Sequence, residues 1–135
     1  MSDTASAIRS TIDAYTKCST AGDIDGLVSL FTEDARQEDP VGQPPNVGHE
    51  AIRGFFENVK NVGPMELSLA QEPIIIGNEA MVFLTVVSHV GDQDVRVPFI
   101  ADHIIFAADG RIQSLRAFFD PATITMAPAA DSPSP

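Results

Sequence analysis

The sequence predicts an α+β fold whose helices come first along the chain and whose strands come second. Apolar residues recur at helical spacing in the first half and alternate as in strands from Met65 onward. The dipeptide Asp109-Gly110, between two alternating runs, is the clearest hairpin signal. We therefore expect three helices packed against a curved, mostly antiparallel sheet, with an apolar cavity enclosed between the two layers.

Three helices account for the first half of the chain. The first is expected over about residues 5–21, where apolar side chains share one face, and Gly22 ends it. Asp23 provides the N-cap of a short second helix. The third helix is expected over about residues 49–61, after a proline-rich loop that begins at Pro40.

Strands make up the second half. An extended segment at residues 35–39 precedes the proline-rich loop and follows a turn at residues 32–34. Apolar residues then alternate with a period of two, which predicts five strands separated by turns. These strands are residues 65–70, 73–76, 79–90, 94–107 and 111–119.

The length of 135 residues is enough for one hydrophobic core and therefore for one domain, which we place at residues 1–126. Residues 127–135 are small, polar and rich in proline, and we predict that this tail is disordered. Cys18 is the only cysteine, so no intrachain disulfide is expected.

Composition and charge exclude several classes of partner. The net charge of −11 repels phosphate backbones and anionic lipid, so neither nucleic acid nor a membrane surface is an expected partner. The N-terminus does not read as a signal peptide, and no apolar stretch approaches the roughly 20 residues of a membrane span. We therefore expect a cytoplasmic protein. The three histidines have no second ligand at metal-binding spacing, which predicts that no metal is bound.

One carboxylate lies within an apolar strand. On the strand face that contains Ile100, Ile104 and Phe106, Asp102 is the only polar residue. An ionised, unpaired carboxylate on such a face is strongly destabilising, so we expect the group to keep its proton. A neutral carboxylic acid in an apolar cavity is a hydrogen-bond donor and suits catalysis. The structural alternative is a buried carboxyl bonded to a backbone amide.

Two further residues are candidates for catalysis. Tyr15 is the only tyrosine and lies on the buried face of the first helix, either as a core residue bonded to a carbonyl group or as a donor to an oxyanion. Asp39 precedes Pro40, which holds it in an extended conformation. A carboxylate on such a stiff segment at the mouth of a cavity suits proton abstraction, while the alternative is a simple Asp-Pro turn.

The block Glu38-Asp39-Pro40-Val41-Gly42 occurs together with the single tyrosine and the strand carboxylate Asp102. With these residues the chain, over about residues 5–120, resembles the bacterial ketosteroid isomerases (steroid Δ-isomerases) of the NTF2-like, SnoaL-type superfamily. Residues 21–26 and 31–35 also match, but these blocks recur across the superfamily and are less specific.

The resemblance implies an NTF2-like cone and a defined reaction. Asp39 resembles the general base that moves a proton from C4 to C6 of a Δ5-3-ketosteroid through a dienolate, which gives the Δ4 isomer. Tyr15 and protonated Asp102 resemble the donors that bind the C3 oxygen as negative charge develops on it. The family also implies an apolar steroid as substrate, a homodimer, and no metal or organic cofactor.

The chain departs from the family around the tyrosine. Phe31 and Phe56 stand where some members have tyrosines that support the oxyanion donor, so an extended phenol network is not expected. Phe119 takes the place of a tryptophan found in some relatives. Apolar side chains are expected to bind the substrate, namely Val41, Phe55, Phe56, Met81, Phe83, Ile100 and Phe119.

Other functions are open on the same fold. A polyketide cyclase or dehydratase also uses an acidic residue near a cavity, and a non-catalytic module binds a steroid or another small molecule without needing Asp39. An epoxide hydrolase requires an arginine between two acids in the cavity. The three candidates for that arginine are interpreted as surface or edge residues, and they are Arg53, Arg96 and Arg116.

Overall fold

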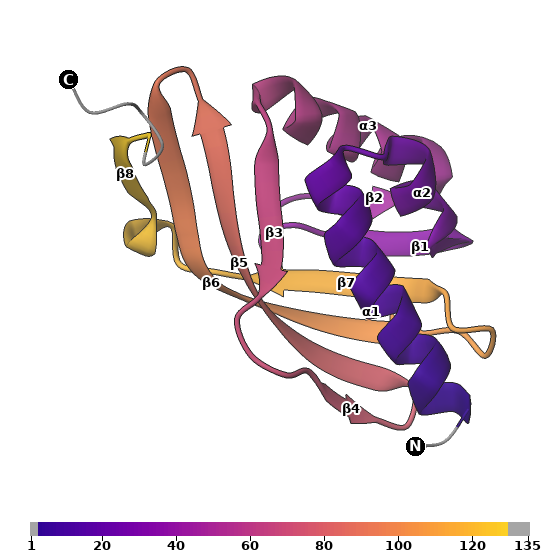
Figure 1. Cartoon of the computed structure of the whole chain (residues 1–135). Coiled ribbons are helices and arrows are strands. Elements are labelled where there is room, and N and C mark those ends of the chain that lie inside the picture. The colour runs from indigo at the N-terminus through magenta and orange to yellow at the C-terminus, as the bar shows by residue number, and fades with distance from the viewer. Residues whose placement is uncertain (1–2, 130–135) are drawn as a thin grey trace.

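Three helices cover one face of a strongly curved sheet in the computed structural model, which describes residues 3–129 (Figure 1). The helices are α1 (Asp3–Ala21), α2 (Ile24–Ser29) and α3 (His49–Val62). This arrangement confirms the predicted α+β fold. Among the helices of these residues, none is long and apolar enough to cross a membrane.

Local chemistry sets the junction between α1 and α2. Gly22 adopts a φ of 67°, which residues with a side chain rarely adopt, and α1 ends there. The carboxylate of Asp23 accepts a hydrogen bond from the backbone N–H of Gly26 at 2.9 Å and caps α2. Both the end of the first helix and the start of the second therefore follow the sequence prediction.

Eight strands form one sheet in the described part of the chain, in the order β2-β1-β7-β6-β5-β3, with β4 beside β5 and β8 beside β6. Only β1 and β7 run parallel, and the other pairs are antiparallel. A short 3-10 helix (Pro121–Thr123) precedes the last strand. The strands are β1 (Phe31–Glu38), β2 (Asn46–Val47), β3 (Met65–Leu69), β4 (Ile74–Ile76), β5 (Glu79–Val90), β6 (Gln93–Phe106), β7 (Ile112–Phe118) and β8 (Thr125–Pro128).

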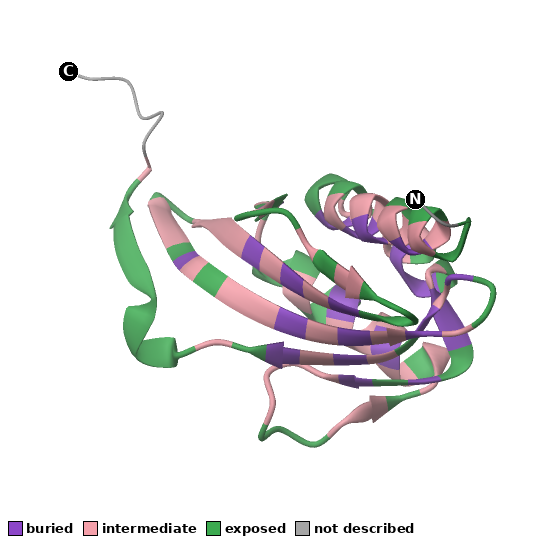
Figure 2. Cartoon of the chain, turned by 90° about the horizontal axis from the view of Figure 1, so that it is seen from below, coloured by how far each residue is buried: buried purple, intermediate pink, exposed green. Residues whose placement is uncertain are grey.

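The core lies between the helices and the face of the sheet that they cover. Buried residues alternate with more exposed ones along the central strands, as a period of two requires (Figure 2). The best buried apolar residues come from both layers and are at most 2% exposed; they include Ile8, Ile12, Phe31, Ile52, Phe106, Ile112 and Leu115.

The two longest strands, β5 and β6, contain an irregularity that changes which side chains face the helices. Leu84 lies opposite Ile100, whereas Val86 lies opposite Val97, so β6 has one residue more than β5 in this interval. Strict alternation would place residues 97 and 100 on opposite faces. Because of the extra residue, both of these side chains reach the helix-covered face.

The early strands differ from the sequence prediction. Residues 32–34, expected as a turn, belong to β1, which begins at Phe31 opposite Ile112 of β7. The two-residue strand β2 was not predicted, because two residues carry no alternation and its pairing with β1 defines it. Pairing between distant segments therefore overrides the local turn preference here.

The C-terminal boundary also lies further along the chain than expected. Ala127 and Pro128, assigned from sequence to a disordered tail, lie in β8 opposite Asp94 and Gln93 of β6. Residues 130–135 of the predicted tail lie outside the described residues. The disorder of that last segment stays a prediction.

Gly63, between α3 and β3, is expected to be required for stability. A Cβ atom at this position would collide with the backbone carbonyl oxygen of His89. Gly63→Ala should therefore lower the free energy of unfolding by about 1–3 kcal/mol. Gly54→Ala is the matched control, because Gly54 lies within α3 and a Cβ there meets no atom within 4 Å. Urea unfolding should show the control to be as stable as the parent or more stable; equal loss in both variants would contradict this account.

Candidate active site

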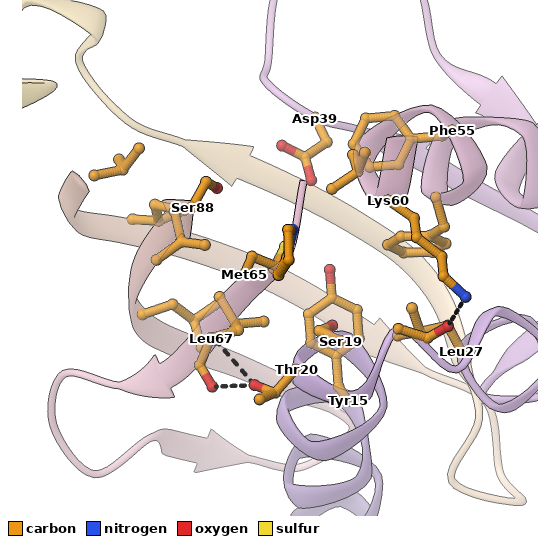
Figure 3. Close-up of a pocket in the computed structure, with 18 of the residues that line it drawn as sticks. Tyr15, Ser19, Thr20, Leu27, Asp39, Phe55, Lys60, Met65, Leu67 and Ser88 are labelled. Carbon is orange, nitrogen blue, oxygen red and sulfur yellow. Dashed lines mark hydrogen bonds between the residues drawn. The ribbon is translucent and has the colours of Figure 1, made fainter. Parts of the chain in front are cut away.

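A cavity of about 440 Å³ lies between the helices and the covered face of the sheet (Figure 3). Small-molecule sites typically have volumes of roughly 300–1,000 Å³. Most of its lining is apolar, and its ionisable side chains are those of Tyr15, Asp39, Lys60 and Asp102. The structure thus brings together, in one cavity, the three candidate catalytic residues that the sequence analysis identified.

Tyr15 reaches the cavity from the buried face of α1, where it is 7% exposed. Its ring and that of Phe56 form a T-shaped pair with centroids 6.3 Å apart, and the centroid of Phe56 lies 6.0 Å from that of Phe31. Burial, followed by negative charge on Asp102 and Asp39, raises the pKa of the phenol well above its ordinary value. The phenol is therefore protonated near neutral pH and is available as a hydrogen-bond donor.

Asp102 lies in the middle of β6 and is only 2% exposed. Its Oδ1 atom has no hydrogen-bond partner among residues 3–129. His103, the next residue, bonds instead to Glu79 Oε1 at 2.7 Å, consistent with its place on the other face of the strand. Burial, with a further contribution from Asp39, raises the pKa of Asp102 well above its usual range. The backbone amide suggested as a partner in the structural alternative is not found for Oδ1.

Asp39 follows the end of β1 and is held close to the strand that contains Asp102. The backbone N–H of Val41 donates to Ala117 O at 2.8 Å, and Ala117 lies directly opposite Asp102 in the β6–β7 pair. Figure 3 shows the carboxylate of Asp39 and the phenol oxygen of Tyr15 pointing into the same space from opposite sides. The base candidate and a donor candidate therefore face one ligand-sized volume.

The two adjacent carboxylates of the Glu38-Asp39 pair have different surroundings. Glu38 lies beside Arg116 and Arg36, with N–O distances of 3.5 and 3.7 Å. Asp39 has no such ion pair in the described structure, and burial raises its pKa to about 7. A carboxylate whose pKa lies near the working pH is well suited to accept and return a proton.

Comparisons with known proteins agree with this architecture. The family model of the SnoaL-like domain matches residues 12–115 of the chain. The chain belongs to the SnoaL-like family. A protein named steroid Delta-isomerase from Nocardioides simplex is 30% identical to it over 122 residues, which span 90% of this chain and 97% of that protein.

Solved structures with the fold of this SnoaL-like protein include Rv0760c from Mycobacterium tuberculosis, with a TM-score of 0.81. The two proteins are 19% identical, and the match covers 90% of this chain and 96% of Rv0760c. Another is SalBIII, described as an epoxide hydrolase/cyclase-like enzyme of pyran ring formation in the polyether salinomycin. It has a TM-score of 0.78 and 24% identity, over 87% of this chain and 93% of the other. At these identities the likeness shows the fold alone.

Four of the apolar residues expected to bind substrate line the cavity of this SnoaL-like protein, namely Phe55, Phe56, Ile100 and Phe119. Met81 and Phe83 do not. Asp102 lies opposite Val82 on β5, so the even-numbered residues there face the helices and the odd-numbered ones face outward. Phe83 stacks on Phe99 on that outer face, with ring centroids 5.6 Å apart. The prediction chose the wrong face of β5.

Val41 also lies outside the cavity. The hydrogen bond from its backbone N–H to Ala117 O on β7 fixes its position. Its side chain lines a separate groove with Pro98 and Phe99. The regular strand β1 ends at Glu38, so Val41 lies beyond it and does not share the strand face that meets the cavity. Val41 contributes through its backbone, which holds Asp39 in position.

Several lining residues near the ends of α1 and α3 were not predicted from the sequence. They include Ser19, Thr20, Val59 and Lys60. Ser19 lies four residues after Tyr15 and so on the same helix face, a signal that was present in the sequence. None of the three arginines considered for an epoxide hydrolase lines the cavity, and no group of three potential metal ligands occurs anywhere in residues 3–129.

Proposed function

We propose that this protein is a steroid Δ-isomerase that converts Δ5-3-ketosteroids into Δ4-3-ketosteroids. The observation that carries the proposal is the convergence of two neutral donors, Tyr15 and Asp102, and one carboxylate, Asp39, on a single apolar cavity. Membership of the SnoaL-like family and the similarity to a protein named steroid Delta-isomerase support it.

The proposed reaction moves one proton within the substrate. The carboxylate of Asp39 removes a proton from C4, and the electron pair of that C–H bond moves toward the C3 carbonyl, which gives a dienolate. Tyr15 and Asp102 donate hydrogen bonds to the C3 oxygen, where negative charge develops. The carboxylic acid of Asp39 then returns the proton to C6, so that the double bond lies between C4 and C5. No cofactor takes part in these steps.

The apolar character of the cavity has a part in this mechanism. Water is a strong competitor for the hydrogen bonds of an oxyanion, and its exclusion strengthens the bonds from protein donors. The aromatic side chains of Phe55, Phe56 and Phe119 are expected to pack against the flat ring system of the steroid. Phe31 and Phe56 add no further hydroxyl, so Tyr15 acts without a phenol network.

The homodimer that the family resemblance implies also stays a proposal. The face of the sheet away from the helices exposes apolar side chains, including Phe99, which is 49% exposed, and Phe118, which is 42% exposed. Such a face is a suitable contact surface for a second copy of the chain.

The test is the conversion of 5-androstene-3,17-dione by the purified protein, followed by the ultraviolet absorbance of the conjugated enone. Rapid appearance of the enone supports the isomerase. Binding of the steroid without conversion would favour the non-catalytic module or a cyclase that acts on another ring system.

The activity is expected to rise with pH through about 7. Asp39 acts as a carboxylate, and burial places its pKa at about 7, so its active form is scarce below that pH and predominates above it. A profile of kcat/KM between about pH 5.5 and 8.5 checks this expectation, since it reports the ionisation of the free enzyme. A flat profile across this interval would show that Asp39 ionises at a much lower pH or is not the base.

A further inference from the structure

The part of the cavity beyond the three candidate catalytic residues contains polar side chains that the proposed reaction does not use. Two of them are already engaged. The hydroxyl of Thr20 donates to Leu67 O at 3.3 Å and accepts from Leu67 N at 3.0 Å, which fastens α1 to β3. The ammonium group of Lys60 donates to Gly22 O at 2.9 Å (Figure 3). These two groups have structural partners.

Ser19 is different, because its hydroxyl lines the cavity and has no hydrogen-bond partner among residues 3–129. The residue is 8% exposed and lines the cavity. Its Oγ atom makes no hydrogen bond within residues 3–129, not even to the carbonyl oxygen of Tyr15 one turn earlier, which is a usual partner of a helical serine. A hydroxyl that an apolar ligand covers without forming a hydrogen bond to it is unfavourable by about 1–3 kcal/mol.

The position of Ser19 relates it to the proposed reaction. It lies four residues after Tyr15, hence on the same face of α1 and about 6 Å further along the helix axis. The rim of the cavity lies in the same direction, since the lining residues Ala21, Lys60 and Pro64 are exposed. A ring system whose ketone is bound at Tyr15 and Asp102 therefore passes Ser19 on its way to the rim.

Ser88 provides a second unpaired hydroxyl on the opposite wall. It lines the cavity from β5, and its Oγ atom likewise has no hydrogen-bond partner in the described chain. Val82 of the same strand lies opposite Asp102, and the six residue steps from 82 to 88 span up to about 20 Å. Hydroxyl groups thus lie both beside and beyond the expected position of the ring system.

We propose that the natural substrate is a ketosteroid with at least one further hydroxyl group, and that Ser19 hydrogen-bonds that group and determines specificity for it. This inference rests on the proposed function for the placement of the ketone. A purely apolar steroid leaves the hydroxyl of Ser19 unsatisfied, whereas a hydroxylated one pairs with it. Sites that hydrogen-bond a hydroxyl of the substrate bind analogues that lack this hydroxyl more weakly.

The experiment measures equilibrium binding by isothermal titration calorimetry. The probes are progesterone and its 11α-, 11β-, 17α- and 21-hydroxy derivatives, which all contain the 4-ene-3-one of the proposed product and are not turned over further. In the parent protein at least one hydroxylated probe should bind about 3- to 10-fold more tightly than progesterone. In Ser19→Ala this advantage should disappear, while progesterone itself binds as well as before or better.

Ser29→Ala is the matched control, because the hydroxyl of Ser29 donates to Gly26 O on the exposed surface of α2. It should keep the full advantage of the hydroxylated probe. The inference would be overturned if the tighter binding of the hydroxylated probe persisted in Ser19→Ala. It would also be overturned if no hydroxylated probe bound the parent protein more tightly than progesterone. If Ser19→Ala unfolds at the same melting temperature as the parent protein, a lost binding preference is not caused by a loss of folded structure.

The conversion of 5-androstene-3,17-dione separates the two proposals. Conversion without any preference for hydroxylated probes would leave the isomerase standing and remove the role of Ser19. A preference that depends on Ser19 without conversion would leave the hydroxyl site standing and remove the isomerase.

Discussion

Asparagine in place of Asp39 is expected to lower the isomerisation rate by about 10²- to 10⁴-fold or more, the usual contribution of a general base. The amide has nearly the same size and shape as the carboxylate but cannot accept the C4 proton. The loss should therefore appear in kcat, with steroid binding retained. Initial rates with 5-androstene-3,17-dione, together with calorimetric binding of progesterone, measure the two effects separately.

The same substitution should change stability in a pH-dependent way. The pKa of Asp39 is raised from 3.8 to about 7 by burial, so the folded protein binds a proton more tightly than the unfolded chain does. Stability therefore falls as pH rises from about 4 to 7, and the loss is complete above that window. Asp39→Asn removes this loss. The free energy of unfolding of the variant should therefore be higher than that of the parent by on the order of 2 kcal/mol at pH 8, and the two should be equal near pH 3.

Glu38→Gln is the control for both measurements. Glu38 is the adjacent carboxylate and lies beside Arg36 and Arg116, outside the cavity. This variant should keep its isomerase activity within a few-fold and should gain no stability at high pH. Equal losses of activity in Asp39→Asn and Glu38→Gln would mean that neither carboxylate is specifically the base.

Leucine in place of Asp102 is expected to lower kcat by about 10²- to 10³-fold, as is typical for the loss of one oxyanion donor. Leucine has a similar volume and no donor. Asp102→Asn keeps an N–H donor at the same place, so its loss should be much smaller, about tenfold. Neither variant should lower the free energy of unfolding, because the native carboxyl is buried with Oδ1 unpaired.

His103→Gln is the neighbouring control, because His103 faces away from the cavity and bonds to Glu79. It should retain nearly full activity. Full activity in Asp102→Leu would contradict the assignment of Asp102 as a donor, and destabilisation of that variant would point to a structural role for the carboxyl.

The sequence allowed the element order and most boundaries to be predicted because periodicity and caps are local properties. The limits of β5 agree with the prediction, and those of β6 and β7 are within one residue. The burial of Asp102 was also predictable, because it shares a strand face with Ile104 and Phe106, and apolar residues at a period of two mark the face that packs on the core.

Properties that depend on pairing between strands were not predictable. The face of β5 that meets the helices is set by the register of Val82 against Asp102, and this register, as well as the extra residue in β6, leaves no local signal. Met81 and Phe83 were therefore assigned to the wrong side. β8 was missed for the same reason, since only its pairing with β6 identifies it as a strand.

The isolation of Tyr15 among phenylalanines has a practical consequence. The chain contains one tyrosine and no tryptophan, so nearly all of its intrinsic ultraviolet fluorescence comes from this one ring. That ring lines the cavity at the place where a ketone oxygen is expected to bind. The protein thus has a natural optical probe at its candidate active site, and occupancy of the cavity can be followed by emission without any label or engineered residue.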